Sequence, residues 1–207
     1  MESKFGAGGS EPRSGVVKLD EAPLVQPAGR QAWRDWLDEN HETSDGAWLV
    51  TGRPNSGVPQ IDYEAAIQEA LCFGWIDGQA GSVDEQRSKL YFSPRRAGSP
   101  WSRYNKRRIE KVTAAGLMRP AGLAVIERAK EDGSWSIFDS VDRLELPAEL
   151  EAALDSRPNA RANWDAWPDG AKRFVLSSIA LAKRPETRVR RAQNAADAAS
   201  RNERPDR

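Results

Sequence analysis

The sequence predicts an α+β fold that is mainly helical, with a small antiparallel sheet in the N-terminal half and a helical C-terminal region. Two observations support this prediction. Short β-rich runs precede Pro100, and from there to the end of the chain apolar residues recur at helical spacing. A chain of 207 residues, 39% hydrophobic and 30% charged, can form one domain with a sizeable core or two small ones.

We expect four parts along the chain. Residues 1–28 contain no apolar periodicity and are rich in glycine and proline, which is typical of a flexible arm. An α+β core is expected over residues 29–145 and a helical region over residues 146–199. Residues 200–207 are expected to be a disordered tail.

Helix and strand alternate at the start of the core. Apolar residues at helical spacing predict a helix over residues 31–41, and a strand is expected over Ala47–Thr51. Asp62 stands in an N-cap position, which predicts a second helix that carries Cys72 and ends at Gly74.

The rest of the sheet is expected after this second helix. The dipeptide Asp77-Gly78 is interpreted as a turn, and a β-rich run over residues 89–93 is halted by Pro94. Glycine and proline then separate a series of amphipathic segments by a few residues each, as compact helical packing requires. The helices expected there cover residues 102–115, 121–131, 148–154, 160–166, 170–182 and 186–199.

Charge and cysteine content limit the function. Basic and acidic residues both number 31, so no net field attracts nucleic acid or a membrane surface. The single cysteine, Cys72, excludes an internal disulfide, and with one histidine it cannot form a zinc site of nitrogen and sulfur ligands. We expect a cytoplasmic protein with no metal and no cofactor.

The segment from Trp75 to Asn105 indicates a binding site. Asp77 follows buried aromatic sequence and either forms its own turn or presents charge at a pocket rim. Further on, Arg95 and Arg96 precede a helix start at which Ser99 and Ser102 compete as the N-cap. Free amides at a helix start next to guanidinium groups favour an anion. The alternative is that these arginines are solvated and that Trp101 anchors the helix in the core.

The expected ligand site combines an aromatic wall with a few polar groups. Its wall is Trp48, Trp75, Phe92 and Trp101, and its polar groups are Asp77, Arg95, Arg96, Ser102 and Asn105. The expected partner is a small anionic or zwitterionic ligand or a peptide end.

Two other functions stay open. An enzyme of unassigned class would use Asp77 as acid or base, with Arg95 and Asn105 orienting an oxyanion. Residues 87–111 contain nine basic residues against one acid, with aromatic residues between them, a pattern that single-stranded nucleic acid could use. His41 is interpreted as a partner of a helix C-terminus, and Cys72 as a buried small hydrophobe.

Several motifs together resemble the YdeI/OmpD-associated family, whose members are also labelled bacteriocin-protection proteins. They are Trp33–Leu37, Gly46–Val50, Ala70–Gly78, Phe92–Asn105, Gly116–Met118, and Ala182-Lys183 with Glu186–Arg188 and Arg191. The resemblance runs from about Gln31 to Ala199. It implies bacterial origin, an α+β N-terminal part with a helical C-terminal region, and a role in tolerance of antimicrobial peptides or envelope stress. Our leading hypothesis is a non-enzymatic binding or stress-tolerance protein.

Overall fold

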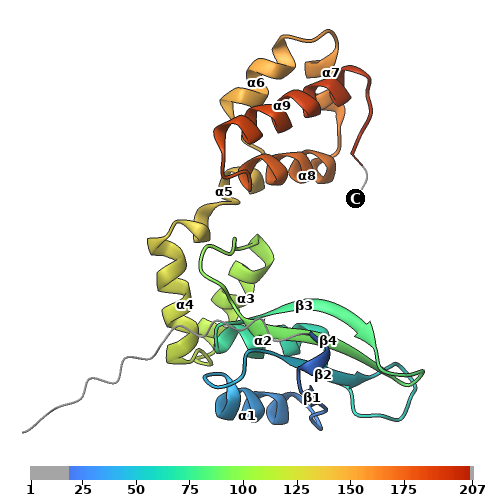
Figure 1. Ribbon diagram of the computed structural model, residues 1–207, viewed down its shortest axis with the longest axis vertical. Coiled ribbons are helices and arrows are strands. Elements are labelled where there is room, and N and C mark those ends of the chain that lie inside the picture. Colours follow the sequence, from blue (N-terminus) through green and yellow to red (C-terminus); the bar gives the residue numbers. More distant parts are fainter. Residues whose placement is uncertain (1–18, 206–207) are drawn as a thin grey trace, which may run out of the picture. The chain divides into compact units, whose positions relative to one another are not determined.

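The computed structural model describes residues 19–205 of the chain, which divide into two compact units (Figure 1). Of the described residues, the first unit contains 19–70 and 75–94, and the second contains 71–74 and 95–205. The parts of the predicted arm and tail that fall on residues 1–18 and 206–207 lie outside the described residues.

The first unit is a four-stranded sheet with helices. Its elements are η1 (Leu19–Glu21), β1 (Leu24–Val25), α1 (Arg30–Asn40), β2 (Ala47–Gly52), α2 (Tyr63–Cys72), β3 (Trp75–Ser82) and β4 (Arg87–Pro94). The strand order is β1-β2-β4-β3, and all pairs are antiparallel except β1 with β2. The predicted α+β class is confirmed, with a sheet that is mixed because of β1.

The strand β1 lies within residues 1–28, the stretch that we expected to be a flexible arm. Leu24 and Val25 pair in register with Trp48 and Leu49, and the indole Nε1 of Trp48 donates a hydrogen bond to the carbonyl of Leu19 at 2.8 Å. This part of the arm is held by the edge of β2, whose backbone groups would otherwise lack partners. The spacing of apolar residues within residues 1–28 does not indicate a pairing with a strand more than 20 positions away in the sequence.

A second correction concerns Asp77-Gly78, which is not a turn. The strand β3 continues through both residues, with a register shift between Asp77 and Ala80. The turn of the hairpin comes later, where the carboxylate of Asp84 accepts hydrogen bonds from the backbone amides of Gln86 and Arg87. The register shift allows Gly78 to stay within the strand, and Asp84 instead of Asp77 stabilises the hairpin turn.

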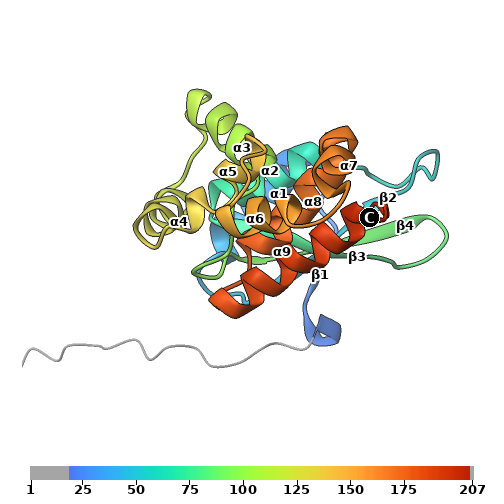
Figure 2. The same ribbon diagram turned by 90° about the horizontal axis from the view of Figure 1, so that it is seen from above.

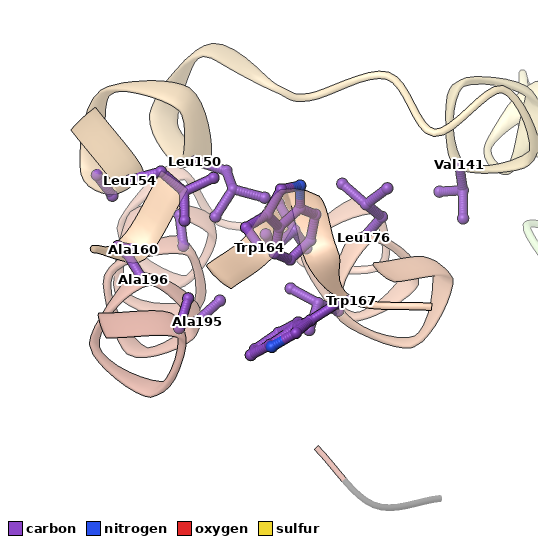
Figure 3. Close-up of a cluster of buried hydrophobic side chains, with 14 residues drawn as sticks. Val141, Leu150, Leu154, Ala160, Trp164, Trp167, Leu176, Ala195 and Ala196 are labelled. Carbon is purple, nitrogen blue, oxygen red and sulfur yellow. The ribbon is translucent and has the colours of Figure 1, made fainter. Parts of the chain in front are cut away.

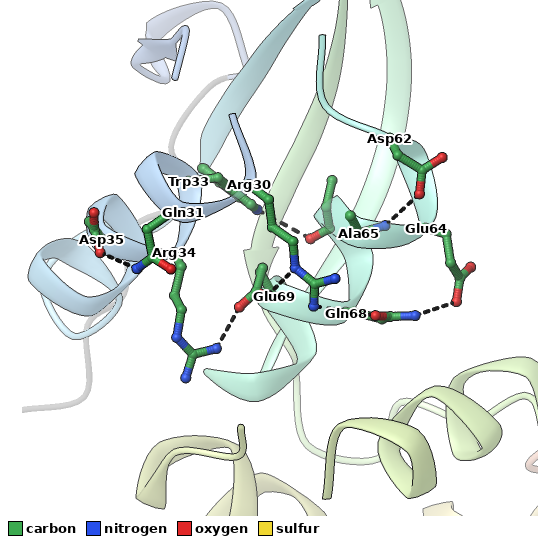
Figure 4. A network of polar contacts seen from close by, with 11 residues as sticks. Arg30, Gln31, Trp33, Arg34, Asp35, Asp62, Glu64, Ala65, Gln68 and Glu69 are labelled. Carbon is green, nitrogen blue, oxygen red and sulfur yellow. Dashed lines mark hydrogen bonds and ion pairs between the residues drawn. The ribbon is translucent and has the colours of Figure 1, made fainter. Parts of the chain in front are cut away.

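Buried charge fastens α1 to α2 (Figure 4). The carboxylate of Glu69, only 2% exposed, receives Arg30 Nε at 2.6 Å and Arg34 Nη1 at 2.5 Å. Beside this network, Trp33 Nε1 donates to the carbonyl of Ala66 at 3.2 Å, and the Trp33 ring packs on Phe92 of β4 at 5.3 Å. The first helix is thus fixed to α2 and to the sheet.

The second unit is helical. Its elements after α2 are α3 (Arg103–Ala114), α4 (Pro120–Glu131), η2 (Ser134–Ser136), α5 (Asp139–Asp142), α6 (Ala148–Asp155), α7 (Ala160–Ala166), α8 (Asp169–Ala180) and α9 (Pro185–Ser200). All six helices predicted for this half are confirmed within two residues at each end. Two short elements, η2 and α5, were not predicted, because segments of three or four residues carry no measurable periodicity.

The core of the C-terminal helices lies against α9, which packs on α6, α7 and α8 (Figures 1 and 2). Trp164 and Trp167 fill its centre, with ring centroids 5.6 Å apart (Figure 3). From α9, alanines with small side chains allow close approach of the neighbouring helices: Ala192, Ala195, Ala196 and Ala199. No helix in the described part of the chain combines the length and the apolar character needed to cross a membrane.

Candidate functional site

The nine predicted site residues are distributed over both units. Trp48, Trp75, Asp77 and Phe92 belong to the first unit, and Arg95, Arg96, Trp101, Ser102 and Asn105 belong to the second. Each group is therefore described within its own unit.

The three aromatic residues of the first unit are core residues. Trp75 and Phe92 are almost fully buried, and Trp48 is 5% exposed. The indole Nε1 of Trp75 donates to the carbonyl of His41 at 3.4 Å, and its ring meets Trp36 edge-on at 5.9 Å. These contacts account for the conformation of the aromatic side chains by packing within the unit.

Asp77 is half-buried, and its Oδ2 accepts a hydrogen bond from the phenol of Tyr63 at 3.0 Å. Tyr63 is the first residue of α2 and is itself exposed. The carboxylate thus ties the middle of β3 to the start of α2. Both predicted roles assumed a turn at this position, and the observed contact is instead one between a strand and a helix.

In the second unit, Arg95 holds the loop that leads into α3. Its side chain is buried, and Nη2 donates to the carbonyls of Ser99 and Pro100 at 3.3 and 2.9 Å. Its guanidinium lies over the ring of Trp101, with Cζ 3.8 Å from the centroid. Arg96, by contrast, is exposed.

The same loop leaves little internal space. The cavity among Arg95, Trp101 and the α4 segment near Asp132 measures about 10 Å³, which is room for no more than about one water molecule. The amide of Gly98 donates to Oδ2 of Asp132 at 3.0 Å, which closes the loop on the end of α4. A small ligand would require a larger space than this loop offers.

Ser102 and Asn105 begin α3. Ser102 is the N-cap, as one of the two predicted alternatives, and its Oγ accepts from the amide of Asn105 at 3.3 Å. The side chain of Asn105 accepts from Arg108 Nη1 at 2.8 Å. Of the two, Ser102 also borders a pocket.

This pocket, of about 240 Å³, lies at the start of α3 and is called the α3 pocket below. Its lining combines three residues of α3's first turn and cap with residues from α5, α8 and the segment before α5: Ser102, Arg103, Tyr104, Phe138, Val141, Asp142, Gly170, Arg173 and Ser177. Ser102 is one of the site residues predicted from the sequence. Arg173 is not, because no local sequence pattern relates α8 to α3.

Positive charge is concentrated in the α3 pocket. Arg103 Nη2 donates to the phenol of Tyr104 at 3.1 Å, and this bond is the main cause that lowers the pKa of Tyr104. Arg107 and Arg173 lower the pKa of Tyr104 further through their charges. The same bond raises the pKa of Arg103. The wall of the pocket therefore stabilises negative charge.

The guanidinium of Arg173 has one bonded donor atom and one that is buried without a partner in the described structure. Its Nη2 donates to Oδ2 of Asp169 at 3.0 Å, one turn earlier on α8. Its Nε is closed off from solvent and has no hydrogen-bond acceptor within the described structure. A buried donor without a partner lowers the stability of the folded chain.

The remaining candidates have structural surroundings. Nδ1 of His41 is 2.9 Å from the carbonyl of Leu37 at the C-terminal end of α1, and the thiol of Cys72 is buried. Cys72 also meets α4, because its carbonyl accepts from the amide of Arg119 at 3.1 Å. Among the described residues, no group of three or more acidic, histidine or cysteine side chains could hold a metal ion.

The basic segment 87–111 is divided between the two units. Part of its charge is paired, since Arg87 binds Asp84 at 2.7 Å and Lys106 forms an ion pair with Asp139. Lys89 lies over the ring of Trp48, with Nζ 4.2 Å from the centroid. Nucleic-acid binding by this segment stays a prediction.

Taken together, the fold and the pocket define an α+β protein whose helical second unit carries a cationic pocket. Residues 143–202 match the family described as "Bacteriocin-protection, YdeI or OmpD-Associated". Residues 25–125 match a domain of unknown function, DUF8412. The chain matches no curated protein and no solved structure at a significant level.

The family assignment is confirmed over a shorter stretch than the motifs predicted. The strings Ala70–Gly78 and Phe92–Asn105 fall within the DUF8412 match, whereas Ala182-Lys183 and Arg191 fall within the YdeI/OmpD-associated match. The match to the family with the bacteriocin-protection description therefore lies in the C-terminal helices.

Proposed function

We propose that this chain is a non-enzymatic, cytosolic stress-tolerance protein of the bacteriocin-protection type, and that it acts by binding a small anionic or zwitterionic ligand in the α3 pocket. The observation that carries the proposal is that Arg103 and Arg173 line one pocket together with the N-cap Ser102. The family match of residues 143–202, which includes Arg173, supports the protection role.

The chemistry of the pocket suits an anion. Guanidinium groups bind carboxylate and phosphate oxygens through paired hydrogen bonds, and both Arg103 and Arg173 line the pocket. The first amides of α3, a helix of 12 residues, add partial positive charge at the same end. Asp142, also in the lining, offers a place for the ammonium group of a zwitterion.

The same residues suggest binding without catalysis. Arginine keeps its proton at physiological pH and is therefore a poor group for proton transfer. Asp77, the candidate acid or base of an enzyme, is engaged by the phenol of Tyr63.

Titration of the full chain with inorganic phosphate tests the ligand site. We expect saturable binding by calorimetry, weakened about tenfold by Arg173→Gln, because a lost charge-assisted hydrogen bond is worth about 1.4 kcal/mol or more. Arg184→Gln, an exposed arginine before α9, serves as the matched control and should bind like the wild type. Equal binding by wild type and Arg173→Gln, or no binding by wild type, would refute the site.

A bacterial strain that expresses the chain tests the protection role. Survival after exposure to a bacteriocin should rise with the wild-type chain and fall back with Arg173→Gln, provided that both accumulate to equal amounts. Equal survival with and without the chain would contradict the role while leaving phosphate binding as a separate result.

A further inference from the structure

A second pocket, of about 410 Å³, lies within the C-terminal helices and is called the α9 pocket below. It is bordered by α5, by the segment that joins α5 to α6, and by α8 and α9. Its volume is near the lower end of the range for ligand sites in proteins, about 300–1,000 Å³, and so suits a small molecule.

Apolar and polar groups share the wall of the α9 pocket. Val141, Leu176 and Ile179 line the pocket and are buried members of the core cluster, in which Figure 3 labels Val141 and Leu176. Ile137 and Leu146 widen this surface. Apolar wall of this kind gains free energy when it contacts an apolar group instead of water.

Two opposite charges complete the lining, the carboxylate of Glu145 and the guanidinium of Arg188. Each is held in place by a partner behind it. Arg143 binds Glu145 through Nε at 2.6 Å and Nη2 at 3.1 Å, and Glu149 accepts from Arg188 Nε at 2.7 Å. The bond from Arg143 also lowers the pKa of Glu145, so this carboxylate is charged at neutral pH.

Both groups keep bonding capacity toward a ligand. A guanidinium has five N–H donors, and within the described residues Glu149 is the one acceptor bound by Arg188. A carboxylate has about four acceptor positions, of which Arg143 uses two on Glu145. The pocket thus offers one cation, one anion and an apolar wall.

We propose that the α9 pocket binds a free α-amino acid with an apolar side chain, such as leucine. The carboxylate of the amino acid binds Arg188, its ammonium group binds Glu145, and its side chain lies against Leu176 and Ile179. A zwitterion matches the two opposite charges, whereas a fatty acid would leave Glu145 without a partner and a cationic peptide would leave Arg188 without one. This site shares Val141 with the α3 pocket but has different charged residues, and the proposal does not rest on the α3 pocket.

Ligand analogues test each part of the match in the full chain. Leucine should bind saturably by calorimetry in the millimolar range or tighter. Glycine, N-acetylleucine and leucinamide each lack one of the three features and should bind about tenfold more weakly. Equal affinity for leucine and glycine would overturn the role of the apolar wall, and no binding of leucine would overturn the proposal. Octanoate binding as tightly as leucine would show an apolar carboxylate site instead.

Variants locate the site. Arg188→Gln should weaken leucine about tenfold, whereas Arg190→Gln, an exposed arginine on the same helix, should not. Because Arg188→Gln also removes the partner of Glu149, Ala180→Leu provides a second variant, which fills the pocket and keeps both charges. Binding that is unchanged in both variants would refute the site. Phosphate affinity should stay unchanged in both, which separates this result from the α3 pocket.

Discussion

The guanidinium of Arg95 lies flat over the indole of Trp101, with 3.8 Å between Cζ and the ring centroid, while Nη2 binds two carbonyls of the same loop. One arginine thus organises the chain between β4 and α3. The buried guanidinium of Arg95 therefore stabilises the loop that precedes α3. Ser102, at the end of this loop, borders the α3 pocket.

Removing this cation should destabilise the second unit. We expect Arg95→Ala to lower the free energy of unfolding by about 3 kcal/mol, from the lost stacking on Trp101 and two charge-assisted hydrogen bonds. Urea unfolding monitored by tryptophan fluorescence measures it. Arg96→Ala, at the exposed neighbour, is the control and should unfold like the wild type. A loss of phosphate affinity in Arg95→Ala without a loss of stability would assign Arg95 to the ligand instead.

The Glu69 network stabilises the first unit. Glu69→Gln removes a buried negative charge that faces both Arg30 and Arg34 (Figure 4), and we expect a loss of about 3 kcal/mol because two guanidinium groups lose their partner. Thermal unfolding measures the change. Asp35→Asn disturbs only an exposed contact with Gln31 and should leave the melting temperature unchanged. A melting temperature that is the same in Glu69→Gln would contradict the interpretation.

Gly122 is the point at which α4 meets the end of α2. A Cβ at this position would overlap the carbonyl of Cys72, which is backbone and cannot move aside. We expect Gly122→Ala to destabilise the protein by about 1–3 kcal/mol, despite the better helix propensity of alanine. Leu123→Ala, at an exposed position next in sequence, is the comparison for urea unfolding. A stabilised Gly122→Ala would show that the helices can separate at no cost.

Asp132 should make stability depend on pH. Hydrogen bonds from Ser134, and from the amide of Gly98, lower the pKa of Asp132 below its ordinary value of 3.8. A lowered folded-state pKa means that this contribution is complete above about pH 5 and is lost as pH falls through the folded-state value. Melting temperatures at pH 7 and pH 3 should therefore differ more in wild type than in Asp132→Asn. An identical pH dependence would remove Asp132 as a cause.

Local chemistry explains what could be predicted from the sequence. The N-cap at Asp62 and the helix end at Gly74 depend on residues within three positions, and both were predicted and found, with Gly74 in the left-handed region. Ser102, one of two predicted alternatives, is the N-cap of α3. The predicted turn at Asp77-Gly78 failed because cross-strand pairing with β4 imposed a strand there. Of the residues predicted for the site, Ser102 borders the α3 pocket, and Arg173, which was not predicted, lines the same pocket from α8.

Periodicity, caps and motifs are local properties, so the α+β class and the helices of the C-terminal half could be predicted from the sequence, as could the resemblance of residues 143–202 to the family that they match. Three features could be seen only in the folded structure. Leu24 and Val25 pair with the sheet, and Arg95 donates hydrogen bonds to carbonyls of its own loop. Arg103 and Arg173 line one pocket. The physical reason is that backbone pairing at a sheet edge and the meeting of charges depend on distances in space. Those distances follow from how the helices and strands pack, which no single segment encodes.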